Sequence, residues 1–225
     1  MITPKEYQVK ILKKSKIAEE TYEVKFERPK NLEYKAGQYM IVRVLSKTAD
    51  GKAPVRALSF SSSPNNKEFL STCFRYDSDP SDFKKLLIEK ETDVIIRCPL
   101  GKFFLPEDNS KETTMIATGV GIVPFLSMLR YLTEIKSSQK VKLIYTDKKE
   151  NRMAYLNELK SIEKENKNVK MITRLKRIDK KFLKENSNLK DSIFYICGRP
   201  EVVEDIQVIL RDLEVNEERI IMEKY

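Results

Sequence analysis

Residues 117–129 read ATGVGIVPFLSML and join a buried strand to a helix through a glycine turn. The strand, TTMIAT, is a short continuous apolar run, and the segment IVPFLSMLRYL keeps apolar residues on one helical face. Glycine allows positive φ and close backbone approach to a bulky anion, and free N–H groups at a helix start attract phosphate. The stretch predicts a pyrophosphate-binding turn at Thr118, Gly119 and Gly121, although a turn with a purely structural role would have the same pattern.

The third small residue of the usual GxGxxG fingerprint is replaced here by Pro124. Proline fixes φ and has no N–H to donate, so it fits a helix only near its start. The small residue that it replaces normally permits close packing of helix on strand. Pro124 therefore predicts a helix start at this point and argues against a standard Rossmann enzyme.

The remainder of the second half repeats the alternation of strand and helix. Short apolar runs at 141–146, 169–173 and 193–198 alternate with helical patterns at 124–135, 152–165 and 201–213. This order predicts a doubly wound α/β domain with a parallel sheet.

The hydrophobic pattern of the first half has a different period from that of the second half. Six strand patterns, at 7–13, 21–27, 38–45, 55–61, 68–76 and 93–100, are separated by turn residues and predict an antiparallel β-barrel or sandwich. One helix is expected at 81–90, with Asp79 or Ser81 as its cap and Pro80 in its first turn. We place the boundary between Pro106 and Lys111, which gives domains 1–108 and 109–225.

Composition agrees with two soluble domains. The chain has 225 residues, 40% of them apolar and 34% charged, with no leader pattern and no apolar run of the roughly eighteen residues that a membrane helix needs. We expect a cytoplasmic protein. The 43 basic and 34 acidic residues give a net charge of +9, which indicates either a solvated lysine-rich surface or attraction of an acidic partner. Nucleic acid is disfavoured, because acidic residues interrupt the basic ones and no binding motif accompanies them.

The cysteine and histidine content limits which metal sites, disulfides and catalytic groups the chain can form. Three distant cysteines argue against a disulfide framework and against a CxxC metal or iron–sulfur site. The absence of histidine excludes imidazole-dependent triads and histidine-ligated zinc. We expect no metal.

Five segments in order resemble the ferredoxin-NADP reductase superfamily: RALSFSS (56–62), CPLGKFF (98–104), TGVGIVPFLSML (118–129), YICGRP (195–200) and the terminal MEKY (222–225). The match covers nearly the whole chain. The resemblance implies an N-terminal FAD-binding antiparallel barrel of Greek-key type and a C-terminal NAD(P)-binding parallel-sheet domain.

On the flavin side, the resemblance implies that Arg56 holds the FAD pyrophosphate and that Ser59 lies near the flavin N5. Leu58 stands where the family most often has an aromatic ring on the isoalloxazine. Leucine forgoes a stacking contribution of about 0.5–1.5 kcal/mol, so the flavin is either a bound prosthetic group or a dissociable substrate.

A second flavin contact is implied further along the barrel. Phe74, Arg75 and Tyr76 occupy the strand that meets the isoalloxazine or ribityl chain in relatives, and the helix start at Ser81 and Asp82 approaches the pyrophosphate. The usual glycine of that loop is absent, and the nearby carboxylates would repel phosphate unless they point away. A capped surface helix is an equally good interpretation.

On the nicotinamide side, the resemblance places Cys197 beside the hydride-donating ring, although a buried structural cysteine is the alternative. The segment that follows it, Gly198, Arg199 and Pro200, would start the next helix at the nucleotide. Relatives often end in an aromatic lid over the flavin with an acidic residue two places earlier. Tyr225 and Glu223 occupy those two positions.

The residues after the second parallel strand give conflicting signals on the nucleotide. Asp147 could accept from a ribose 2′-OH, as NAD requires, whereas Lys148, Lys149 and Arg152 could hold the 2′-phosphate of NADP. Arg174 adds another possible phosphate partner. Counting cations favours NADPH over NADH.

The resemblance implies an FAD-dependent oxidoreductase that moves a hydride from NAD(P)H to the flavin N5. Electrons would then pass to an acidic carrier protein such as ferredoxin, or to another iron–sulfur protein. The alternatives are an NAD(P)H:flavin reductase, an electron-transfer subunit of a larger complex, and a binding module that has lost flavin.

Overall fold

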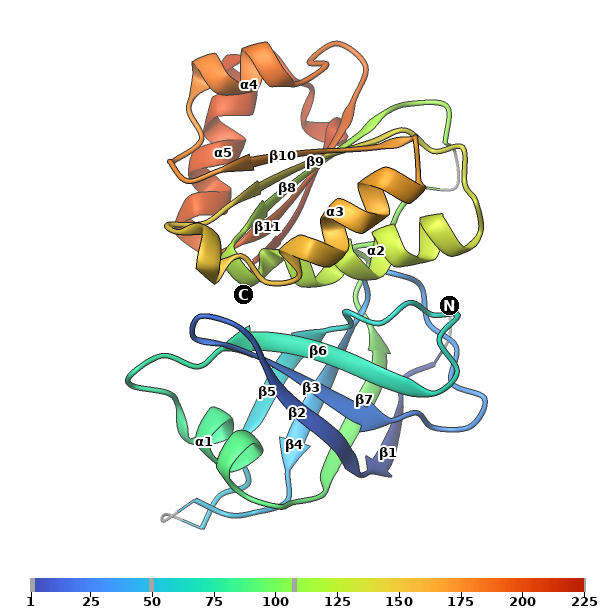
Figure 1. Cartoon of the computed structure of the whole chain (residues 1–225), viewed down its shortest axis with the longest axis vertical. Helices are drawn as coiled ribbons and strands as arrows, with labels where there is room; N and C mark the ends of the chain where they lie inside the picture. The colour runs from blue at the N-terminus through green and yellow to red at the C-terminus, as the bar shows by residue number, and fades with distance from the viewer. Residues whose placement is uncertain (1–2, 49–50, 107–108, 225) are drawn as a thin grey trace.

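The computed structural model describes residues 3–48, 51–106 and 109–224, which form two lobes stacked along the long axis of the molecule (Figure 1). In its described residues, the first lobe contains one helix, α1 (Asp82–Glu89), and seven strands. The strands are β1 (Lys5–Val9), β2 (Ile11–Ala18), β3 (Thr21–Glu27), β4 (Tyr39–Val44), β5 (Val55–Ser59), β6 (Phe69–Arg75) and β7 (Val94–Leu100).

These strands form two antiparallel sheets with the orders β1-β7-β4-β5 and β2-β3-β6. Every second side chain points into one core, which includes Val24, Phe26, Met40, Phe60 and Ile96. The predicted antiparallel barrel is confirmed as a barrel-like pair of sheets. In the four-stranded sheet β5 lies at one edge, so among the described residues it has a neighbouring strand, β4, on one side only.

The second lobe is a parallel sheet between two layers of helices. Its elements are β8 (Thr113–Thr118), a 3-10 turn (Gly119–Gly121), α2 (Ile122–Glu134), β9 (Val141–Thr146), a 3-10 turn (Glu150–Arg152), α3 (Leu156–Glu165), β10 (Val169–Arg174), α4 (Lys180–Asn186), β11 (Ile193–Gly198), α5 (Pro200–Asp212), a 3-10 turn (Glu217–Arg219) and β12 (Ile220–Lys224). The strand order is β10-β9-β8-β11-β12, so the chain reverses direction across the sheet after β10. Helices α2 and α3 cover one face, and α4 and α5 cover the other. The predicted doubly wound sheet is confirmed.

Three local predictions differ from the structure. The single strand expected at 7–13 is divided at Lys10, because β1 pairs with β7 and β2 pairs with β3 in the other sheet. Pro80 lies outside α1, whose first residue is Asp82, and the Ser81 side chain makes no capping hydrogen bond. Helix α4 and strand β12 were not expected; both are short, at seven and five residues. The predicted boundary at 106–111 includes residues 107–108, which lie outside the described residues, and it stays a prediction.

The two lobes share apolar contacts. Ala36, Cys73 and Phe103 from the first lobe belong to the same buried cluster as the α2 side chains. Rings of Phe103 and Phe125 lie 5.6 Å apart between centroids. Helix α2 therefore packs against both its own sheet and the barrel. None of the helices in the described ranges is long and apolar enough to cross a membrane.

Candidate active site between the two lobes

The glycine turn after β8 brings the ends of β8 and β11 into direct contact. Gly119 has a φ of +59°, as predicted for a glycine turn, but Gly121 has a φ of −61°. Gly121 is required for a different reason, since an added Cβ there would lie 2.1 Å from the carbonyl oxygen of Cys197. A Cβ on Gly198 would lie 1.9 Å from the hydroxyl oxygen of Thr118. Backbone atoms of Cys197 and the Thr118 side chain thus occupy the space next to the two glycines. Pro124 is the third residue of α2, so the predicted helix start is confirmed.

This junction lies where the strand order reverses, between β8 and β11. In open α/β sheets ligands bind at the carboxyl ends of the strands at this switch point. Gly119 has a positive φ, and helices α2 and α5 begin beside the junction, at Ile122 and Pro200. Pro200 has no N–H to donate, so a phosphate here would be bound by N–H groups further along the first turns. The junction fits the diphosphate of a dinucleotide.

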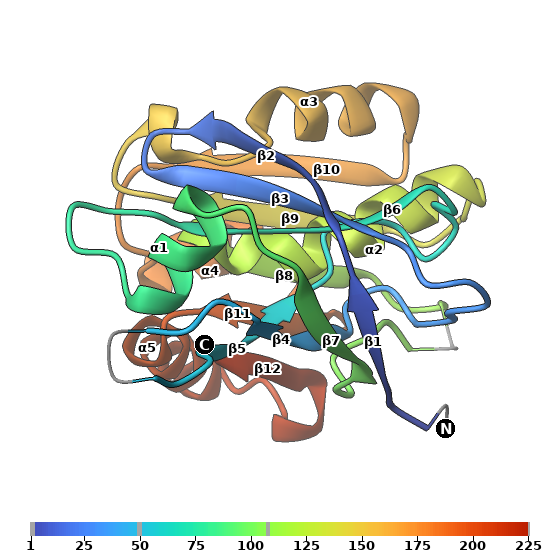
Figure 2. The same cartoon turned by 90° about the horizontal axis from the view of Figure 1, so that it is seen from below.

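Three predicted site residues from distant parts of the chain meet beside this junction. The Ser59 hydroxyl donates to Oε2 of Glu223 at 3.2 Å, which links β5 of the barrel to β12 of the parallel sheet. Cys197 pairs in register with Glu223 on the neighbouring strand. Figures 1 and 2 show the C-terminal end of β12 beside β5. Ser59, Cys197 and Glu223, which the sequence resemblance predicts to take part in redox chemistry, are hereafter called the redox cluster.

Burial changes the protonation of this cluster. It raises the pKa of the Glu223 carboxyl from 4.5 to about 7, and the hydrogen bond from Ser59 opposes part of that rise. Burial also raises the pKa of the Cys197 thiol well above its ordinary value, and the Glu223 carboxylate adds to this effect. Cys197 is therefore a neutral thiol at pH 7, whereas Glu223 can take up or release a proton there.

The shifted carboxyl makes stability depend on pH. Because the pKa is about 7 in the folded chain and 4.5 in the reference state, Glu223 costs no stability below pH 4.5 and an increasing amount between 4.5 and 7. The cost reaches at most about 3 kcal/mol, since one pKa unit corresponds to about 1.4 kcal/mol. Glu223→Gln should therefore stabilise the protein relative to wild type at about pH 8 more than at about pH 5. Urea denaturation of both proteins at the two pH values measures this, and an equal difference at both would contradict the assignment.

The flavin-side residues lie on the open edge of the barrel. Arg56 and Leu58 stand opposite Val42 and Met40 in the register of β5 with β4, so they share one face of β5. Arg56 is exposed, and within the described residues its guanidinium donates only to the Val55 carbonyl oxygen, at 3.2 Å. Among the described residues, the Ser81 hydroxyl at the start of α1 is buried without a partner. A cation without a carboxylate partner and an orphaned hydroxyl at a helix start both fit a flavin diphosphate.

Arg75 is bound by groups of both lobes. Its guanidinium donates to Asp147 and to the backbone oxygens of Glu19 and Arg152, the last two at 3.1 and 2.9 Å. It also comes within 3.7 Å of the position of a Cβ on Gly119. Arg75 therefore connects the barrel to the glycine turn. A backbone contact of Arg75 with flavin stays a prediction.

The residues expected to select the nucleotide are already paired. The Asp147 side chain is only 5% exposed and is bonded to Arg75, to Arg152 at 3.5 Å and to the Lys148 backbone N–H at 2.7 Å. Arg152 also donates to Glu20. Asp147 and Arg152 therefore connect the second lobe to the barrel residues Arg75 and Glu20. Roles for Asp147 and Arg152 in nucleotide binding stay predictions. Lys148 is exposed and lies beside them.

The other residues predicted to bind flavin or nucleotide differ in burial and in their partners. Phe74 is buried against Phe83, whereas the Tyr76 ring meets Tyr22 edge-on and its hydroxyl donates to Glu89. Asp82 opens α1, and Arg199 is exposed directly before α5. Tyr225, the expected lid, lies outside the described residues. No three His, Cys, Asp or Glu side chains gather to hold a metal ion in the part of the chain that the structure describes.

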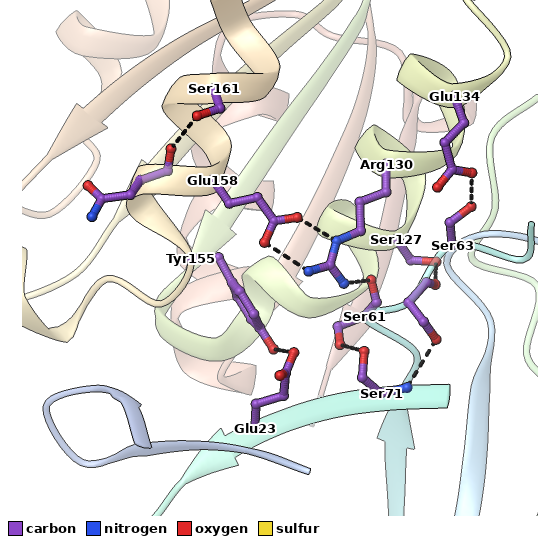
Figure 3. A network of polar contacts seen from close by, with 12 residues as sticks. Glu23, Ser61, Ser63, Ser71, Ser127, Arg130, Glu134, Tyr155, Glu158 and Ser161 are labelled. Carbon is purple, nitrogen blue, oxygen red and sulfur yellow. Dashed lines mark hydrogen bonds and ion pairs between the residues drawn. The ribbon is translucent and has the colours of Figure 1, made fainter. Parts of the chain in front are cut away.

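Sequence analysis missed the polar network that joins the lobes (Figure 3). Arg130 on α2 binds Glu158 of α3 through two nitrogens, at 2.6 and 2.8 Å, and donates to the Ser61 carbonyl oxygen at 2.8 Å. Tyr155 donates to the barrel residue Glu23 at 2.9 Å. The only signal for this network was the serine run FSSSP, whose partners lie 65 to 71 residues away.

Comparison with known proteins agrees with this arrangement. The profile described as "Oxidoreductase NAD-binding domain" matches residues 115–208. A flavohemoprotein of Bacillus cereus is 32% identical over 148 residues, which is 58% of this chain and 37% of that protein. This chain thus spans about a third to a half of the length of the flavohemoproteins that it matches.

Two solved structures share the whole architecture. The cytochrome b5 reductase domain of Ulva prolifera nitrate reductase superposes with a TM-score of 0.84 at 18% identity, covering 97% of each chain. A ferredoxin NADP+ reductase from Neisseria gonorrhoeae with bound FAD and NADP superposes with a TM-score of 0.78 at 22% identity, covering 98% of each chain. The two-lobed fold of this chain is therefore that of dinucleotide-binding reductases. Residues 115–208 thus match the oxidoreductase NAD-binding domain family, and the whole chain shares its two-lobed fold with these reductase structures.

Proposed function

We propose that this protein transfers a hydride from NAD(P)H to the N5 of FAD, and that it passes the electrons on to a carrier protein. The observation that carries the proposal is the hydrogen bond between Ser59 and Glu223. It brings the strand expected to hold flavin against the strand pair expected to hold nicotinamide. FAD supplies the redox chemistry when it is bound, and the protein supplies alignment and electrostatics.

The residues have separate tasks in this proposal. Arg56 and the start of α1 bind the flavin diphosphate, and the Gly119–Gly121 turn binds the diphosphate of the nicotinamide nucleotide. Thr72 donates to the Ser59 carbonyl oxygen at 2.8 Å, which fixes the backbone of β5 at the redox cluster. Ser59 and Glu223 hold a proton between Oγ and Oε2, and a carboxyl with a pKa of about 7 can exchange that proton with solvent at neutral pH.

The charge of the protein favours one kind of electron acceptor and one of the two nicotinamide nucleotides. A net charge of +9 favours an acidic partner such as ferredoxin, in a cytoplasmic location. Association with such a partner should weaken as salt rises. Asp147 is already paired, and Lys149 forms an ion pair with Glu19 at 4.0 Å, whereas Lys148 is an exposed cation available to the ribose end. A cation at this position favours NADPH over NADH.

A second candidate function is NAD(P)H:flavin reductase activity with flavin as a substrate. Two observations favour it: leucine at position 58 in place of an aromatic ring, and the exposed edge of the barrel at β5, where Val55 is 43% exposed. Flavin that stays with the protein through gel filtration would exclude it. Operation as an electron-transfer subunit would appear as activity only with partner proteins added.

The proposed function is tested by the visible spectrum of the purified protein with FAD. Anaerobic NADPH, and more weakly NADH, should bleach the absorption of the bound flavin. If flavin binds and neither nucleotide bleaches it, hydride transfer is contradicted. If no flavin binds after addition of FAD, the chain is a binding module that has kept the fold without its cofactor.

A further inference from the structure

Arg130 is a largely buried cation that contacts three residues of two separate segments, α3 with its N-cap and the barrel. Its side chain is 20% exposed and forms the two-nitrogen ion pair with Glu158 described above. The same guanidinium lies over the ring of Tyr155, 5.4 Å from the centroid. Its remaining bond crosses to the barrel, where it donates to the Ser61 carbonyl oxygen. A planar guanidinium suits this arrangement, because its donors point in fixed directions.

The residues of α2 around Arg130 bind the same barrel segment. Ser127 donates to the Ser62 carbonyl oxygen at 2.6 Å, and Ser63 donates to Glu134. Positions 127, 130 and 134 lie on one face of the helix. One face of α2 therefore holds the three consecutive residues 61–63 of the barrel (Figure 3).

Both ends of this connection lead to the candidate active site. Ser61 is two residues after Ser59, whose hydroxyl belongs to the redox cluster. Helix α2 begins at Ile122, directly after the glycine turn expected to bind nucleotide. The polar face of α2 thus forms a covalent and hydrogen-bonded connection between the strand that would carry flavin and the turn that would carry NAD(P)H, in addition to the Ser59–Glu223 hydrogen bond.

We infer that Arg130 is a positioning residue for hydride transfer: it fixes the Ser59 segment relative to the glycine turn without contacting either nucleotide. The inference rests on the proposed function. Its physical basis is that hydride transfer requires reacting atoms about 3–3.5 Å apart, so that a displacement of about 1 Å can cost about 100-fold in rate. Lost hydrogen bonds between the lobes should therefore lower the rate of the chemical step more than the affinity for either nucleotide.

The test compares wild type with Arg130→Met and Arg130→Lys. Arg130→Met should lower the limiting rate of flavin reduction at saturating NADPH by about 10- to 100-fold, since the Ser59 segment loses its position. The dissociation constants of FAD and NADP+ should change by less than about threefold, because Arg130 touches neither site. Arg130→Lys should recover part of the rate, as one bond to Ser61 can re-form.

A second readout does not depend on activity. In the flavin-free protein, amide hydrogen exchange across residues 59–66 should be about tenfold faster in Arg130→Met than in wild type, because the segment loses a buried bond. Arg211→Met is the matched control: it removes an Arg–Glu ion pair with Glu217 in the same lobe, on the exposed part of α5. Arg211→Met should leave both the rate of flavin reduction and the amide hydrogen exchange of residues 59–66 unchanged. Should Arg130→Met fail to fold, Ser127→Ala removes one bond to the same segment and should show the same pattern, more weakly.

Two results would overturn the inference. In the first, Arg130→Met loses flavin affinity in proportion to its loss of flavin-reduction rate. In the second, the rate and the amide exchange of Arg130→Met equal those of Arg211→Met. If wild type itself reduces no flavin, the proposed function fails. In that case the exchange measurement alone decides whether Arg130 positions the segment.

Discussion

Replacement of Gly121 by alanine is expected to destabilise the protein by about 3 kcal/mol or more and to abolish nucleotide binding. Inserted atoms in a packed interior cost about 1–3 kcal/mol when side chains can adjust. Here the new Cβ would lie 2.1 Å from the carbonyl oxygen of Cys197, 2.5 Å from its carbonyl carbon and 2.9 Å from the Gly198 nitrogen, all of which are backbone atoms. The ends of β8 and β11 must therefore separate. Chemical denaturation and titration with NADP+ measure the two effects.

Gly119→Ala is the matched control two residues earlier in the same turn. Its φ of +59° makes alanine unfavourable by about 1–2 kcal/mol, but the nearest atom to the new Cβ is the Arg75 Nη2 at 3.7 Å. The fold should therefore survive, and the loss of stability should be smaller than in Gly121→Ala. If the two variants lose equal stability, steric contact is not what requires glycine at 121.

Replacement of Arg56 by alanine is expected to weaken FAD binding by about 100-fold while leaving nucleotide affinity almost unchanged. Hydrogen bonds from a guanidinium to phosphate are about twice as strong as neutral ones, and at this site no carboxylate among the described residues competes for the cation. A 100-fold change corresponds to about 2.8 kcal/mol. Fluorescence titration with FAD and calorimetry with NADP+ give the two constants.

Arg97→Ala is a suitable comparison, because Arg97 is also an exposed arginine of the same sheet, on β7. It should change FAD affinity by less than about threefold. Equal losses of flavin and nucleotide affinity in Arg56→Ala would mean that the flavin diphosphate lies elsewhere.

Periodicity alone predicted most of the fold. The alternating first half and the βα second half have different hydrophobic periods, and each period corresponds to one of the two observed lobes. The errors arose where local patterns carry no information on partners. Residues 7–13 form one continuous strand pattern of alternating residues, but the chain changes sheets at Lys10, and only pairing with β7 and β3 shows this. Strand β12 is too short to be recognised without β11 beside it.

The candidate site was predictable in part. Motifs identified Ser59, Cys197 and Glu223 individually, and the structure brings them together. Ionic partners were not predictable, because Arg75 and Asp147 are 72 residues apart and no spacing rule relates them. For the same reason Arg130 gave no sequence signal, and its importance follows only from the contacts that α2 makes with the barrel.

The most direct test of the account is a crystal structure of the protein with FAD and NADP+ bound together. The account predicts that the flavin lies along β5 with N5 near the Ser59 hydroxyl, that the nucleotide diphosphate lies on the Gly119–Gly121 turn, and that the nicotinamide C4 stands about 3–3.5 Å from N5. A nucleotide diphosphate bound away from that turn, or two redox rings on opposite sides of the Ser59–Glu223 bond, would contradict it.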